Sequence, residues 1–236
     1  MKKVTTKALD ENLKEWASYN EKLQPAMTEF TEIKRQLLEP RMSISQMCRI
    51  LGIGPSVVLN WHSRIMDKFS IPRPKKQKWA HFSLSDLLFY EIVKEVKKRG
   101  IDVEKSMGLY QYIRNDFIEF DNFVHLARGT DYMIIYDFAK SDVFRFRKDP
   151  FAALKQLATI PLLNNYYLTI PIGLVIRKLL QNHDLQKIFD DSFRISVLKD
   201  GKLDFIINKR PSILKSMPDK PLKWLVKNGV PTLVFE

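Results

Sequence analysis

Residues 42–85, MSISQMCRILGIGPSVVLNWHSRIMDKFSIPRPKKQKWAHFSLS, decide the fold of this chain because they carry two short helical patterns separated by a turn. Ser43 is a favourable N-cap, and apolar side chains recur after it at helical spacing up to Leu51. Gly52 suits the positive φ angle of a helix end, and Pro55 suits the first turn of the next helix. The stretch therefore predicts a helix-turn-helix.

The second helix of this pair, over residues 55–65, has two distinct faces. Val58, Trp61 and Ile65 fall at i, i+3 and i+7, so they are expected to hold the helix against the first one. The opposite face is expected to be exposed and carries Ser56, Leu59, Asn60 and Ser63. A helix that presents such a face can enter the major groove of duplex DNA.

Basic residues are concentrated in the same part of the chain. Residues 41–81 hold eight lysines and arginines and one acidic residue, which gives +7 of the formal net charge of +12. Such a cluster neutralises DNA phosphates but carries little sequence information. We therefore expect the 55–65 helix in the major groove and a basic wing over residues 72–82 on the backbone. The expected DNA-binding residues are Gln46, Arg49, Ser56, Leu59, Asn60, Ser63, Arg64, Arg73, Lys75, Lys76, Lys78 and His81.

Residues 43–106 resemble the DNA-binding module of the MerR family of winged-helix regulators. The family's xIxxxAxxxGV helix is matched by residues 44–53, and the proline and aromatic residue of its recognition helix by Pro55 and Trp61. Its aromatic-Ser-x-x-Asp-Leu run is matched by residues 82–87, and the helix, glycine and short fourth helix that follow by residues 88–105. The resemblance covers little more than a quarter of the chain and implies a winged helix-turn-helix that reads double-stranded DNA.

The chain also departs from the MerR pattern. It has Leu59 where the recognition helix commonly carries an arginine, and Ala80 where a wing arginine is usual. Leu59 can instead contact thymine methyl groups, and Asn60 can pair with an adenine edge. A module of this kind can also serve as a docking platform for proteins, and the sequence leaves both functions open. We expect a transcriptional regulator or an accessory factor of phage or plasmid origin.

Residues 1–41 precede the module and predict an amphipathic helical arm. Its stripe alternates spacings of four and three, which is typical of a coiled coil. Pro25 predicts a kink, or two shorter helices with the second starting near it. Self-association through this stripe and packing on the chain's own core both remain open. The stripe comprises Leu9, Leu13, Trp16, Asn20, Leu23, Met27, Phe30, Lys34 and Leu37.

Residues 107–129 predict a connecting helix with a second apolar stripe. Regulators of the resembling family commonly dimerise through a helix at this place, and paired copies can read two DNA half-sites. We therefore expect a homodimer. The expected dimerisation residues are Tyr110, Ile113, Phe117, Phe120 and Val124.

Residues 130–236 predict an α+β domain with a small antiparallel sheet, on a chain that is otherwise mainly α. Residues 131–138 and 142–147 are typical of strands, residues 149–159 of a helix, and residues 171–181 of a buried helix. Residues 193–207 predict a hairpin that turns at Lys199-Asp200-Gly201. The tail 230–236 predicts a further strand.

The sequence gives no sign of catalysis, and we expect neither an enzyme, a cofactor nor a metal. The four histidines are isolated, and no Gly-x-Ser-x-Gly elbow or phosphate loop is present. Asp190-Asp191 is better explained as a solvated turn than as a cation site. A small-molecule or protein effector is possible at the C-terminal domain, and its tyrosines are either pocket walls or core and rim. These tyrosines are Tyr132, Tyr136, Tyr166 and Tyr167.

The compartment is expected to be the cytoplasm. No apolar run approaches the roughly 20 residues that cross a bilayer, and the first residues lack the apolar region of a signal peptide. Cys48 is the single cysteine, which excludes intramolecular disulfides, and it is expected to fill the core. No membrane partner is expected.

Overall fold

The computed structural model describes residues 6–68, 81–98, 100–128, 133–137, 142–146, 167–189, 192–217, 223–227 and 230–234. The first elements are α1 (Thr6–Leu38), β1 (Met42–Ser43), α2 (Ile44–Leu51), α3 (Pro55–Lys68), β2 (His81–Phe82) and α4 (Leu84–Lys98). They are followed by the 3₁₀ turn η1 (Val103–Ser106), α5 (Met107–Gln111), the π-helical turn η2 (Tyr112–Phe117) and α6 (Phe120–Ala127).

The C-terminal part contains short strands and helices. They are β3 (Met133–Asp137), β4 (Asp142–Phe146), β5 (Tyr167–Pro171), α8 (Ile172–Leu180), α9 (His183–Gln186), β6 (Phe193–Val197) and β7 (Leu203–Ile207). The last elements are β8 (Arg210–Pro211), the 3₁₀ turn η3 (Ile213–Ser216), β9 (Lys223–Lys227) and β10 (Val230–Val234). The described structure is thus mainly helical, with small antiparallel sheets in its C-terminal part, as the sequence predicts in outline.

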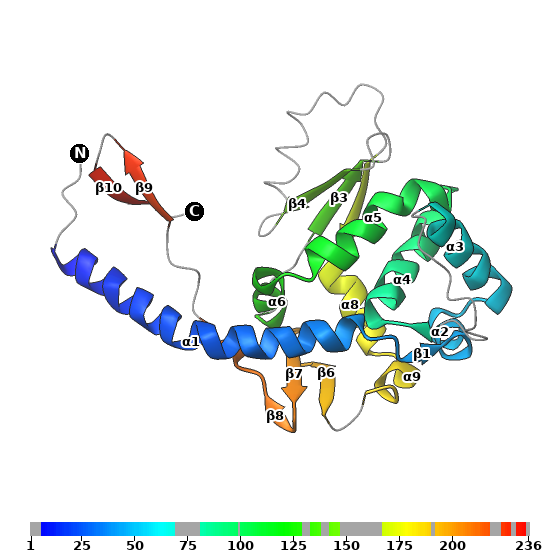
Figure 1. Cartoon of the computed structure of the whole chain (residues 1–236), viewed down its shortest axis with the longest axis horizontal. Coiled ribbons are helices and arrows are strands. Elements are labelled where there is room, and N and C mark those ends of the chain that lie inside the picture. Colours follow the sequence, from blue (N-terminus) through cyan, green and yellow to red (C-terminus); the bar gives the residue numbers. More distant parts are fainter. Residues whose placement is uncertain are drawn as a thin grey trace.

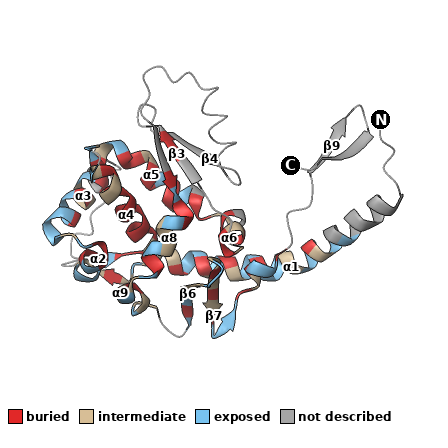
Figure 2. Ribbon diagram, turned by 180° about the vertical axis from the view of Figure 1, so that it is seen from behind, coloured by how far each residue is buried: buried red, intermediate tan, exposed pale blue. Residues whose placement is uncertain are grey.

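Helix α4 lies at the centre of the molecule (Figure 1). Its sequence is apolar on nearly every side, and residues 85–93 and Val96 are all buried. It contacts α1, α2, α8 and the turns η1 and η2. Most of its ribbon is coloured as buried in Figure 2. Helix α2 therefore packs on a helix that is itself buried along most of its length.

Helix α1 is one continuous helix with Pro25 inside it, which corrects the expectation of two shorter helices. Its C-terminal half packs on the rest of the chain, while its N-terminal half runs past the packed part (Figure 1). The predicted stripe is wrong by one position at three places. Asn20, Met27 and Lys34 are exposed, whereas the residue before each of them is buried, because the partner of this helix is the chain's own core.

The connecting segment is not a single dimerisation helix, which corrects a second expectation. Ile118 and Glu119 leave the helical conformation between η2 and α6. The apolar stripe also faces inward, and its residues fill the core of the same chain. Buried in this way are Tyr110, Ile113, Phe117 and Val124, while the side chain of Phe120 lies outside the described residues. In this conformation the four buried residues have no surface to offer a second copy.

The strands form several small sheets rather than the single sheet that was expected. The antiparallel orders are β4-β3-β5, β6-β7-β8 and β10-β9, together with the short β1-β2 ladder. The hairpin β6–β7 and its turn are confirmed, with Gly201 at φ +80°, and so is the tail strand β10. Strands β5, β8 and β9 were not predicted. The helix predicted over 149–159 lies outside the described residues.

Of the tyrosines and aspartates singled out in the C-terminal half, Tyr136 is the one whose side chain the structure describes. Tyr136 belongs to the core, with its hydroxyl donating to the carbonyl oxygen of Lys105 at 2.7 Å. Tyr132 and Tyr166, the side chain of Tyr167, and the Asp190-Asp191 pair lie outside the described residues.

One hydrophobic core joins the segments that the sequence predicted as separate domains. It runs from Tyr19 on α1 through α4 to Met217 near the end of η3. Polar contacts also join α1 to η3: Glu29 accepts hydrogen bonds from the Ser212 hydroxyl and the Ile213 amide. Among the described helices, none has the length and apolar character that a bilayer crossing needs.

Candidate nucleic-acid interface

Helix α2 begins and ends as its sequence predicts. The hydroxyl oxygen of Ser43 accepts from the Gln46 amide at 3.3 Å, and the Gln46 side-chain oxygen accepts from the Ser43 amide at 2.9 Å. This capping box stabilises the first turn. At the other end Gly52 has φ +66° and its amide donates to the carbonyl oxygen of Cys48. Gln46, expected to contact DNA, is exposed but is engaged in the cap.

Helix α3 is held by its inner face, as predicted. Val58, Trp61 and Ile65 are buried, and the Trp61 ring stacks on Tyr90 of α4 at a centroid distance of 6.4 Å. His62 adds a polar contact, since its Nδ1 lies 3.0 Å from the Tyr90 hydroxyl. Burial, and then the nearby Asp86 carboxylate, raise the pKa of Tyr90 well above its usual value. The hydroxyl therefore stays protonated and available to this contact.

The outer face of α3 is accessible. Ser56 and Asn60 are exposed, and Leu59 is 47% exposed. Ser63 is partly exposed, and Val57, which the sequence analysis did not single out, is exposed next to this face. Asn60 is thus not covered by its own chain and Trp61 does not point to solvent, as the helix-turn-helix prediction requires.

Two of the expected DNA-binding arginines already have acidic neighbours. Arg49 is 65% exposed and its Nη1 lies 4.0 Å from an oxygen of Asp184 on α9. Arg64 is about half exposed and lies 2.9 Å from Glu104 on η1. Ion pairs at exposed positions contribute little free energy, so both guanidinium groups can exchange these partners for a phosphate.

The basic segment begins and ends beside these two helices. Arg73, Lys75, Lys76 and Lys78 fall within residues 69–80, outside the described residues. The segment starts where α3 ends, and it ends at β2, where exposed His81 pairs with Ser43 at the start of α2. The basic residues predicted to form a wing thus lie in a segment that is joined to the candidate interface at both ends.

The N-terminus of α4 has a capping arrangement of its own. The Asp86 carboxylate accepts from the amide and the hydroxyl of Ser83, at 2.9 and 2.7 Å, and the Ser83 hydroxyl oxygen accepts from the Asp86 amide. Arg114 lies 3.7 Å from the same carboxylate. The Ser-x-x-Asp spacing in residues 83–86 is a recognisable capping signal, which gives the motif a structural role in addition to its family resemblance.

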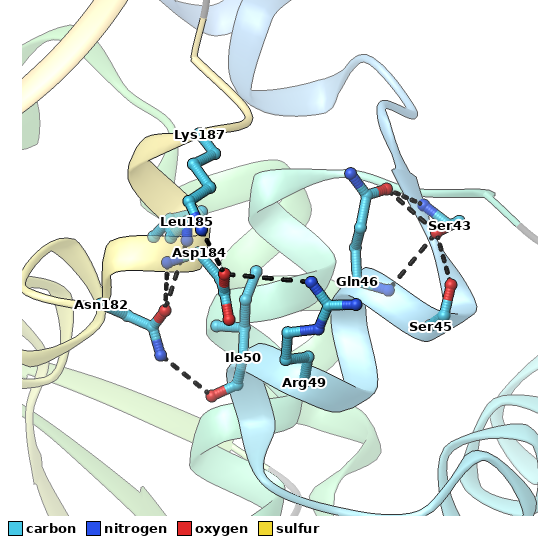
Figure 3. A network of polar contacts seen from close by, with 9 residues as sticks. All are labelled: Ser43, Ser45, Gln46, Arg49, Ile50, Asn182, Asp184, Leu185 and Lys187. Carbon is cyan, nitrogen blue, oxygen red and sulfur yellow. Dashed lines mark hydrogen bonds and ion pairs between the residues drawn. The ribbon is translucent and has the colours of Figure 1, made fainter.

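A polar network joins α2 to α9, more than a hundred residues later in the chain (Figure 3). The Asn182 side chain donates to the carbonyl oxygen of Ile50 at 3.5 Å, and its own oxygen accepts from the amides of Asp184 and Leu185. Asp184 then contacts Arg49 on one side and Lys187, at 3.2 Å, on the other. The C-terminal part therefore contacts the helix that leads into the turn at Gly52.

A second network anchors the same, C-terminal end of α2 on α4. Lys94 of α4 donates to the carbonyl oxygen of Leu51 at 2.9 Å and lies 2.6 Å from the carboxylate of Glu91. Glu91 is 3% exposed and also lies 3.4 Å from Lys178 of α8. Neither residue was predicted, although a glutamate and a lysine three residues apart on one helix are a usable signal for such a pair.

The described residues offer little else with chemical function. Within them, no three His, Cys, Asp or Glu side chains are grouped so that they could hold a metal ion. Cys48 is buried, as expected of a core residue, and burial raises the pKa of its thiol. A thiol of this kind is a poor nucleophile and a poor ligand.

No protein-family model matches this chain, and the search of curated proteins finds no similar sequence. The function is therefore inferred from the geometry and the charge of the interface, together with the motifs in its sequence.

Proposed function

We propose that this protein binds double-stranded DNA in a sequence-specific way, with α3 in the major groove. The observation that carries the proposal is the contrast between the two faces of α3. One face is fixed on α4 through Trp61, and the other presents Leu59 and Asn60 to solvent. The most basic part of the chain follows α3 directly in the sequence. A rigid helix with an open polar face next to basic residues is suited to reading base edges.

The residues on α3 suggest how bases are read. An asparagine amide can form two hydrogen bonds with adenine in the major groove, and an apolar side chain can contact the methyl group of thymine. We assign these roles to Asn60 and Leu59. Ser56 and Ser63 are assigned to nearby bases or phosphates, because a hydroxyl both donates and accepts.

Phosphate contacts are assigned to the basic residues around α3. Arg49 lies on α2 and Arg64 on α3 itself, and residues 69–81 add four more basic residues. Their contacts position the protein on the duplex and carry no sequence information. The role that best fits such a module is a transcriptional regulator, or an accessory factor of a phage or plasmid, acting in the cytoplasm.

We retain the homodimer in the proposal but move its contact to the N-terminal half of α1. This half runs past the packed part of the molecule, and its sequence continues the apolar stripe through Leu9, Leu13 and Trp16. Light scattering of the full chain should give the mass of two copies. Replacing Leu9 and Leu13 by glutamate should give one copy, whereas Lys14→Glu, with the same change in charge, should not. A full chain of monomer mass overturns the dimer.

A docking module for another protein is the second candidate function. It is favoured by Val57 and Leu59, two apolar side chains exposed on the same helix. Such a module would attract DNA only weakly and without regard to sequence, so binding experiments separate the two candidates.

The proposal is tested by titrating duplex binding with salt. Replacing Lys75, Lys76 and Lys78 together by glutamine should weaken binding to every duplex and reduce the slope of log K against log salt by about 3. The control replaces Arg194, Lys199 and Arg210, exposed residues of the β6–β8 sheet, and removes the same charge. An unchanged slope in the first variant, or equal losses in both, contradicts a wing on the DNA backbone.

A further inference from the structure

An apolar cavity of about 70 Å³ lies where α4, α6, α8, α9 and the β6–β7 hairpin meet. Its walls come from segments far apart in the sequence, including Leu88 of α4, Phe123 of α6, Leu180 of α8 and Phe205 of β7. With the exception of Ser85, all the side chains that line it are hydrophobic.

The size and the polarity of the cavity do not suit water. A single water molecule occupies roughly 10–15 Å³ on this scale and needs two to four polar partners. The cavity is several times larger, and its walls offer one hydroxyl group. Apolar cavities of this kind stay dry and bind small apolar molecules, since an occupant restores the dispersion contacts that an empty space lacks.

Ser85 supplies a second and independent observation. Its side chain is buried, and its hydroxyl has no hydrogen-bond partner in the part of the chain that the structure describes. A buried hydroxyl without a partner costs free energy. Ser83, two residues earlier, is buried as well, but its hydroxyl is engaged in the cap of α4. The structure thus leaves a hydrogen-bonding group unused in a residue that lines the cavity.

We propose that this cavity binds a small, mainly apolar molecule with one hydroxyl group, which bonds to Ser85. The site is separate from the outer face of α3, so binding to it can be measured without DNA. Its walls nevertheless include α4, α8 and α9, and the same helices hold α2 through Lys94 and Asn182. It is thus a candidate for the effector site expected in the C-terminal part.

The test uses phenol and toluene as probes of the full chain, with calorimetry to measure binding and melting curves to verify folding. Both probes should bind the unchanged protein, with phenol bound more tightly. Ser85→Ala should reduce this preference, the ratio of the two dissociation constants, by about five- to tenfold while toluene still binds. Failure of either probe to bind at millimolar concentration, or an unchanged preference in Ser85→Ala, overturns the proposal.

Two variants on α8 test whether the probes bind in the cavity. Leu180 lines the cavity, so Leu180→Phe should fill it and abolish binding of both probes. Leu174 on the same helix is 57% exposed, so Leu174→Phe should leave binding unchanged. Binding that persists in a folded Leu180→Phe protein overturns the proposal. If that variant does not fold, the Ser85→Ala comparison decides.

Discussion

Arg49 of α2 and Asp184 of α9 form an ion pair, with 4.0 Å between the guanidinium and carboxylate atoms (Figure 3). The pair places a negative charge beside an arginine that we assign to a DNA phosphate. In the proposed complex, DNA competes with Asp184 for Arg49, and the carboxylate also repels the phosphates. We therefore expect the C-terminal part to lower the affinity of the interface for DNA.

Asp184→Asn should for this reason strengthen duplex binding, by about two- to fivefold at low salt, because an exposed pair is worth up to about 1 kcal/mol. Fluorescence anisotropy at two salt concentrations measures the effect, which should shrink as salt screens the charges. Asp200→Asn removes the same charge from the hairpin turn and should change affinity less. Equal gains in the two variants would mean that only net charge matters.

Asn60→Ala should reduce discrimination rather than general affinity. Loss of a bidentate contact to adenine costs about 1–3 kcal/mol at one base position and leaves the others unchanged. Binding to a set of duplexes with single base changes measures this effect. The matched control is Asn115→Ala, exposed on η2, which should bind every duplex like the unchanged protein. An equal loss of affinity for all duplexes would show that Asn60 does not read a base.

Gly52→Ala should destabilise the protein by about 1–2 kcal/mol, because an alanine at φ +66° adopts a left-handed conformation. No other atom lies within 4 Å of an added Cβ, so the cost comes from the backbone alone. Gly52→Asn should cost less, since asparagine tolerates this conformation. Denaturant unfolding compares the two variants, and equal stabilities would exclude backbone strain as the cause.

Glu91→Gln should destabilise the protein by about 2 kcal/mol, because it leaves the partly buried ammonium of Lys94 without its carboxylate. Lys178 is largely exposed, and solvent screening keeps its share small. Glu95→Gln on the same helix removes an exposed pair with Lys98 and should cost less than about 0.5 kcal/mol. Chemical denaturation measures the stability of both variants. Similar losses of stability would show that Glu91 does not anchor Lys94.

The local signals of the helix-turn-helix were readable in the sequence. Ser43, Gly52 and Pro55 act through the backbone of their own neighbours, so their roles do not depend on the rest of the fold. The same holds for Asp200-Gly201, which turns the β6–β7 hairpin. The inner and outer faces of α3 followed from helical spacing alone.

The sequence does not show what an apolar stripe packs against. Periodicity shows that Tyr110, Ile113 and Phe117 share a face, but it is the same whether that face meets a second copy or the chain's own core. On α1, the choice between Ala26 and Met27 depends on where the helix packs. The contact from Asn182 to Ile50 spans 132 residues and leaves no local pattern.

The most direct test of the proposed function selects bound fragments from a pool of random duplexes and then compares a selected duplex with a scrambled one at physiological salt. A sequence-specific reader should bind the selected duplex about 10³-fold more tightly, or better, and Asn60→Ala should reduce that ratio. Equal affinities for the two duplexes would contradict the proposal and favour α3 as a docking surface for a protein.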